Sequence, residues 1–156
     1  MNIFETYLKK LQDLILENKS ILKVESDISF LGTVVETPPQ EFNYDLSTNI
    51  ALVLAKKVQQ PPIKLAETLK KLILKNLDDF SDIHIAGPGF INFRFSTKIY
   101  QKIIIDILKS NNNYGSNNKK ATYNIEFVSA NPTGPMHVGH SRGAIFGDVL
   151  ANLLIF

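Results

Sequence analysis

The sequence feature that most constrains the fold is the alternation of apolar and polar residues at positions 90–95, FINFRF. Successive side chains of a strand point to opposite faces, so Asn92 and Arg94 lie on the more polar of the two faces. A shorter apolar run, IHI, precedes this stretch, and AGPG at residues 86–89 joins the two runs. Gly-Pro-Gly between two such runs predicts a turn that connects antiparallel strands.

Helical periodicity surrounds this predicted hairpin. Apolar residues three and four positions apart predict helices at residues 2–18, 46–58, 62–77 and 97–110. Residues 21–36, rich in Ile, Val, Phe and Thr, predict one or two short strands. Helices packed on a small antiparallel sheet make an α+β domain.

Composition narrows the class of protein. A chain of 156 residues can build one good core and at most part of a second, and 44% hydrophobic with 21% charged residues is ordinary globular composition. The lack of cysteine excludes disulfides and cysteine-ligated metals. The lack of a long apolar run or a signal peptide favours a cytoplasmic protein with no membrane span. A net charge of +2 is too small to indicate nucleic-acid binding by itself.

A polar, low-complexity stretch, SNNNYGSNNKK at residues 110–120, interrupts the chain. Such a segment cannot build a core, so it predicts a linker at residues 111–121. We therefore expect a domain at residues 1–110 and the beginning of a second, truncated one at residues 122–156.

The second segment carries the most specific chemistry. Residues 123–128 predict a strand, residues 129–135 a loop with two prolines and a glycine, and a helix follows from about residue 138. His137 and His140 fall at the first turn of that helix, where free N–H groups and the helix dipole attract phosphate. Imidazoles three residues apart can donate to phosphate oxygens. This arrangement suits a reaction in which charge develops on phosphate oxygens.

Simpler interpretations stay open on the residues alone. A zinc-binding helix has histidines four apart with an adjacent glutamate, which is not the spacing here, so no metal site is predicted. His137 and His140 could be ordinary surface histidines. Asn92 and Arg94 could belong to a solvated sheet face rather than to a nucleic-acid surface, and before any resemblance the solvated face is favoured.

Residues 130–140, ANPTGPMHVGH, resemble the HIGH signature of class I aminoacyl-tRNA synthetases, and the longer run at residues 125–154 is similar to arginyl-tRNA synthetases. DLSTN at residues 45–49 and AGPGFINFRFS at residues 86–96 resemble parts of that family's extra N-terminal domain. Tyr44 departs from the pattern, which has glycine before the aspartate, and this puts the backbone of that turn in doubt.

The resemblance implies roles for individual residues. His137 and His140 would stabilise the α-phosphate of ATP while the arginine carboxylate attacks it, and Gly139 would leave room for the adenine side of ATP. The residues that match arginine-binding positions are Glu126, Ser129, Asn131 and His137.

The resemblance also implies fold and partners. Residues 122–156 would begin a Rossmann-type α/β catalytic domain, and the strand with Asn92 and Arg94 would contact the tRNA elbow. The substrates would be L-arginine, arginine tRNA and ATP, with magnesium accompanying the ATP, and the protein would act as a monomer.

Three functional hypotheses follow. The first is an arginine–tRNA ligase fragment whose isolated chain is inactive, because the second signature loop would lie beyond residue 156. The second is a stand-alone, non-catalytic module that binds the tRNA elbow, and the third is a degraded gene product without function. The intact HVGH motif favours the first. We expect residues after about 120 to be loosely held, or to lean on a first domain that folds alone.

Overall fold

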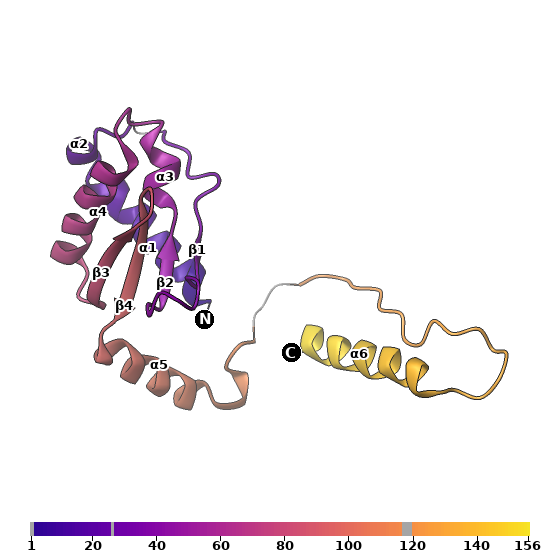
Figure 1. Ribbon diagram of the computed structural model, residues 1–156. Coiled ribbons are helices and arrows are strands. Elements are labelled where there is room, and N and C mark those ends of the chain that lie inside the picture. Colours follow the sequence, from indigo (N-terminus) through magenta and orange to yellow (C-terminus); the bar gives the residue numbers. More distant parts are fainter. Residues whose placement is uncertain (1, 26, 117–119) are drawn as a thin grey trace. The chain divides into compact units, whose positions relative to one another are not determined.

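A computed structural model describes residues 2–25, 27–116 and 120–156 of the chain. It divides into two compact units, Met1–Tyr114 and Gly115–Phe156 (Figure 1). The division falls inside the predicted linker at residues 111–121, of which residues 117–119 lie outside the described part.

The first unit contains a four-stranded antiparallel sheet with strand order β1-β2-β4-β3 (Figure 1). The strands are β1 (Val35–Glu36), β2 (Leu46–Thr48), β3 (Phe80–Ala86) and β4 (Phe90–Phe95). The two long strands are adjacent in the sheet and in the sequence, so the predicted hairpin is confirmed.

The turn of this hairpin depends on its glycines. Gly87 and Gly89 have φ values of +51° and +137°, which residues with a Cβ atom rarely adopt. A Cβ atom at Gly89 would also lie 3.2 Å from the backbone carbon of Pro62. This close approach lets the tip of the hairpin pack against the start of α4 (Pro62–Asn76), the helix that precedes the hairpin in the chain.

Helices cover one face of the sheet and bury its apolar side chains. The helices of the first unit are α1 (Ile3–Glu17), α2 (Lys19–Leu22), α3 (Ile50–Ala55), α4 and α5 (Thr97–Ser110), followed by the short 3-10 helix η1 (Asn111–Asn113). Asn2 caps α1 by accepting from the amide of Phe4, and Pro62 begins α4, where its missing N–H costs nothing. The helices predicted at residues 2–18, 62–77 and 97–110 are thereby confirmed.

The core lies between this face of the sheet and the helices. Leu46, Ile91 and Phe93 from the strands pack with Leu54 and Ile73 from α3 and α4, all at most 2% exposed. Since strand neighbours in register share a face, Ser47 and Asn92 must point to the opposite face, away from this core. We call this opposite side the outer face.

Two predictions in the first unit were wrong in part. Residues 46–48 form β2 rather than the first turn of a helix, because Leu46 pairs with Phe93 in the sheet, and the helix begins only at Ile50. Residues 21–36, expected to be strands, contribute the end of α2 and only the two residues of β1; residue 26 lies outside the described part. Local apolar patterns do not carry these non-local pairings.

Among its described residues, 115–116 and 120–156, the second unit forms one regular element, α6 (Val138–Ile155), as expected from about residue 138. The strand predicted at residues 123–128 does not form, because the described part of this unit offers no second strand with which it could pair. Gly147 is the single buried residue of α6, and large apolar side chains such as Val138 and Phe146 are exposed. No described helix combines the length and apolar character needed to cross a bilayer.

Candidate functional site

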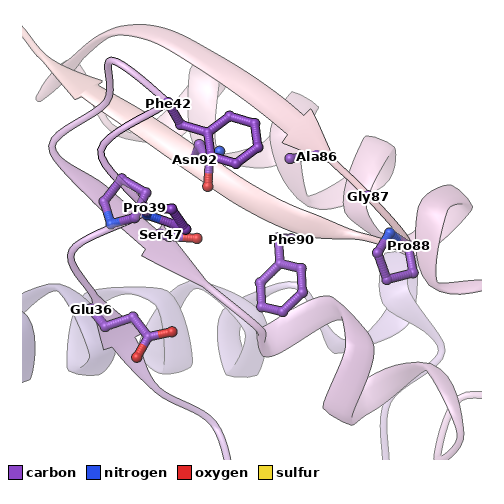
Figure 2. A pocket seen from close by; sticks show the side chains of 10 residues that line it. Glu36, Pro39, Phe42, Ser47, Ala86, Gly87, Pro88, Phe90 and Asn92 are labelled. Carbon is purple, nitrogen blue, oxygen red and sulfur yellow. The ribbon is translucent and has the colours of Figure 1, made fainter.

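The outer face of the sheet holds a pocket of about 310 Å³ (Figure 2). It is bounded by the hairpin tip, by β2 and by the loop between β1 and β2. The lining residues are Glu36, Pro38, Pro39, Phe42, Ser47, Ala86, Gly87, Pro88, Phe90 and Asn92. Aromatic rings and prolines make most of the wall, and few polar groups enter it, which is the usual character of a small-ligand or base-binding pocket.

Asn92 is the most deeply buried polar residue in this wall. It is only 2% exposed, and in the sheet it lies between Ser47 on β2 and His84 on β3. Within the described part of the chain, no hydrogen bond satisfies its side-chain amide. The Asn92 amide is not among the fully buried polar atoms that lack a partner in the described residues, so it keeps some contact with solvent. Its donors and acceptor are therefore available to a polar, planar ligand in the pocket.

Two aromatic rings stand beside this amide. Phe90 precedes Asn92 by two residues on β4 and shares its face, whereas Phe42 comes from the loop after the two prolines (Figure 2). Both rings are half-buried. A flat heterocycle can stack on such rings while the amide reads its polar edge, as in proteins that recognise unpaired bases.

The sequence placed Asn92 and Arg94 on one strand face, and the structure bears out that shared face. The two residues differ in exposure, however, because Asn92 is buried in the pocket wall, whereas Arg94 is exposed and does not line the pocket. The hypothesis of a simple solvated face therefore fails for Asn92. Sequence reasoning missed Phe42, Ser47 and Phe90; of these, Phe90 could have been found from its period-two spacing with Asn92.

A polar cluster surrounds Arg94 on β4. Arg94 Nη2 donates to the Asn43 carbonyl at 2.6 Å, and its guanidinium lies over the Tyr44 ring, 5.0 Å from the centroid. The Tyr44 hydroxyl donates to Asp82 Oδ2 at 2.7 Å, and its ring stacks with His84 at 5.8 Å. Tyr44 has a negative φ, which resolves the doubt about a side chain at that position.

The second unit holds an open, polar pocket of about 490 Å³ at the start of α6. Four of the predicted site residues line it together: Ser129, Asn131, His137 and His140. Glu126 is absent from the lining, but its carboxylate accepts a hydrogen bond from the Ser129 hydroxyl. The structure thus brings together the residues that the sequence assigned to one site, apart from Gly139.

The two histidines are fixed by the backbone at the helix start. His137 Nδ1 accepts from the Gly139 amide at 3.1 Å, His140 Nδ1 accepts from the His137 amide at 3.5 Å, and the rings stack at 3.8 Å. A neutral imidazole that accepts at Nδ1 carries its proton on Nε2. Both rings therefore offer an Nε2–H donor, which is the group needed to bind phosphate oxygens.

The structure explains why position 139 holds a glycine, which the sequence did not reveal. A Cβ atom at Gly139 would lie 3.0 Å from His137 Cε1 and 3.1 Å from Nδ1. The glycine therefore makes room for the His137 ring to fold back and cap α6. Room for the adenine side of ATP, implied by the resemblance, stays a prediction.

Comparison with known proteins identifies the family. The family model described as the arginyl tRNA synthetase N terminal domain matches residues 4–95. The arginine–tRNA ligase of Pelagibacter ubique is 47% identical over 158 residues, which cover 100% of this chain and 27% of the ligase. Those of Rickettsia bellii (strain OSU 85-389) and of a Wolbachia from Brugia malayi are 45% and 42% identical, each covering 99% of this chain and 26% of the ligase.

The first unit thus has a mostly apolar pocket with the Asn92 amide in its wall, and the second has a polar pocket at the start of α6 that His137 and His140 line. The chain belongs to the arginyl-tRNA synthetase family and contains that family's N-terminal domain. It spans about a quarter of the length of the curated relatives it matches.

Proposed function

We propose that the chain is the N-terminal portion of an arginine–tRNA ligase, which activates L-arginine with ATP and transfers it to arginine tRNA. The observation that carries this proposal is the identity of 47% with an arginine–tRNA ligase along the whole chain. The first unit would bind tRNA, and the second would contribute part of the ATP and arginine sites. The 156 residues alone would be inactive, and the protein would work in the cytoplasm as a monomer.

The tRNA role rests on the outer-face pocket. An unpaired base of the tRNA elbow would stack between Phe42 and Phe90, and the Asn92 amide would hydrogen-bond to its edge. Arg94, exposed beside the pocket, would meet the negatively charged backbone. The low net charge of the chain fits recognition through one pocket better than broad electrostatic attraction.

The activation role rests on the start of α6. The Nε2–H groups of His137 and His140 would donate to α-phosphate oxygens as the arginine carboxylate attacks and pyrophosphate leaves. Asn131, Ser129 and Glu126 would contact arginine, whose guanidinium pairs well with a carboxylate.

Magnesium would arrive with ATP rather than reside in this chain. Within residues 2–25, 27–116 and 120–156, no three His, Cys, Asp or Glu side chains gather so that they could hold a metal ion. Mg²⁺ usually keeps several waters and binds the phosphates of its substrate, so ATP itself would supply its main ligands.

A chimera tests the proposal. The corresponding first part of the Pelagibacter ligase is replaced by this chain, and arginine-dependent exchange of pyrophosphate into ATP is measured together with tRNA arginylation. We expect an active chimera. His140→Ala should lower both reactions at least tenfold, whereas Asn92→Ala should lower arginylation and leave tRNA-independent steps unchanged.

His137 needs a matched pair of variants in the same chimera. His137→Asn keeps a side chain that can cap the helix but lacks the Nε2–H donor, whereas His137→Ala loses both. Equal loss of activity in the two variants would support a chemical role, and full activity of His137→Asn would contradict it. An inactive chimera that still binds arginine tRNA would favour the alternative, a stand-alone tRNA-elbow binding module.

A further inference from the structure

Arg94 is an exposed cation whose orientation is already fixed. One N–H group binds the Asn43 carbonyl at 2.6 Å, and the guanidinium rests over the ring of Tyr44. Long surface side chains normally keep much rotamer freedom, and these contacts remove part of it before any ligand binds. The remaining N–H groups make no other hydrogen bond within the described residues. The Arg94 guanidinium is thus an oriented hydrogen-bond donor of the kind that binds anions.

A carboxylate stands directly across the sheet from this cation. Asp82 on β3 and Arg94 on β4 are register partners, and such pairs have Cβ atoms about 5 Å apart on the same face. Opposite charges in this position attract each other and are close enough to form an ion pair. Yet no ion pair joins Asp82 and Arg94 in the described part of the chain.

Tyr44 explains why Asp82 and Arg94 do not form an ion pair. Its hydroxyl donates to Asp82 Oδ2 at 2.7 Å, and its ring occupies the space beneath the guanidinium. The same hydrogen bond lowers the pKa of the Asp82 carboxyl and raises the pKa of the Tyr44 phenol. One side chain therefore engages the carboxylate and supports the guanidinium at once.

We propose that Tyr44 is a positioning residue: by engaging Asp82, it keeps Arg94 free of its cross-strand carboxylate, so that Arg94 can bind a phosphate of the RNA backbone beside the pocket. This inference rests on the proposed tRNA-binding function. Arg94 and Asn92 are two residues apart on one strand face, about 7 Å along β4. A nucleotide whose base enters the pocket would thus bring a phosphate within reach of Arg94.

Tyr44→Phe separates this role from a structural one, because it keeps the ring and deletes only the hydroxyl. Asp82, released from its donor, would turn to Arg94 and neutralise it. Affinity for RNA should fall about threefold to tenfold, and the slope of log K against log salt should lose about one unit, as for Arg94→Gln. Asp82→Asn in the Tyr44→Phe background removes the competing charge and should restore both values.

The experiment measures binding of an arginine tRNA transcript to the 156-residue chain between 50 and 200 mM salt, a range set by the counterion-release effect. Rescue of Tyr44→Phe by Asp82→Asn supports the inference. If Tyr44→Phe binds like the wild type while Arg94→Gln binds weakly, or if Asp82→Asn fails to rescue, the inference is overturned and the proposed function stands. A wild-type chain that binds no tRNA overturns both.

Discussion

The Tyr100 hydroxyl donates a hydrogen bond to Asp45 Oδ1 across 2.7 Å, which ties the first turns of α5 to the residue before β2. The other oxygen of the same carboxylate accepts from the Phe95 amide at 2.8 Å, at the end of β4. Asp45 therefore joins three elements, and the helix that leads out of the first unit is anchored to the sheet next to the outer face.

This link predicts a specific alkaline transition. Burial, followed by the hydrogen bond to Asp45, raises the pKa of Tyr100 to about 12 from its ordinary value of 10. The folded state thus holds this proton more tightly than the unfolded state does. Its contribution to stability is complete below pH 10 and is lost as the pH rises from 10 towards 12. Urea unfolding of the wild type should show this decline, and Tyr100→Phe should flatten it.

Tyr7 should also contribute to the alkaline decline in the free energy of unfolding. Burial also raises the pKa of the Tyr7 phenol, so part of the alkaline decline should persist in Tyr100→Phe. Tyr100→Phe and wild type with identical stability curves between pH 9 and 12 would contradict the role assigned to the Asp45 bond.

The core should respond to Ile73 in proportion to the volume removed. Ile73 lies on α4 and is fully buried against the sheet. Ile73→Val should lower the free energy of unfolding by about 1 kcal/mol and Ile73→Ala by about 2–5 kcal/mol. Urea titration followed by far-ultraviolet circular dichroism measures both. A cost below 0.5 kcal/mol for the alanine variant, at the low limit for a core site, would contradict this packing.

The hairpin tip offers a matched pair of glycines. Gly89→Ala combines a φ of +137° with a Cβ atom 3.1–3.3 Å from Pro62, whereas Gly87→Ala has a positive φ but open space. Gly87→Ala should cost about 1 kcal/mol and Gly89→Ala clearly more, about 2–3 kcal/mol. Thermal unfolding of the two variants tests the difference, and equal costs would argue against the close approach to α4.

The start of α6 should depend on the His137 cap. His137→Ala removes the acceptor for the Gly139 amide and should destabilise the first helical turn by about 1 kcal/mol, while His137→Asn should retain it. Carbon chemical shifts of residues 138–142 report the helical population in each variant. Loss of helicity in both variants alike would show that the ring, rather than a side-chain acceptor, supports the turn.

Sequence reasoning succeeded where the determining interactions are local. The hairpin follows from period-two alternation and a Gly-Pro-Gly turn, and α4 follows from one apolar stripe after two prolines. It failed at residues 46–48, where helical spacing hid a strand whose partner, Phe93, lies far along the chain. It failed again at residues 123–128, where strand-like residues have no strand to pair with among the described residues of their unit.

In the pocket, too, local patterns predict some residues and not others. Alternation along β4 could place Asn92, Arg94 and Phe90 on one face, and the structure agrees. The approach of Phe42 could not be foreseen, because it depends on the course of a loop after Pro38 and Pro39 rather than on a repeating pattern. The burial of Asn92 follows from that loop and could not be foreseen either.

Asn92→Leu tests the central claim most directly, because leucine has nearly the shape of asparagine without its polar atoms. Two quantities are measured on the 156-residue chain: the free energy of unfolding and the dissociation constant for an arginine tRNA transcript, with Asn152→Ala as a control outside the pocket. If the amide is kept for RNA, Asn92→Leu should leave the free energy of unfolding unchanged to within about 1 kcal/mol and weaken binding at least tenfold. Unchanged tRNA affinity, or a loss of stability that accounts for the weaker binding, would contradict the account.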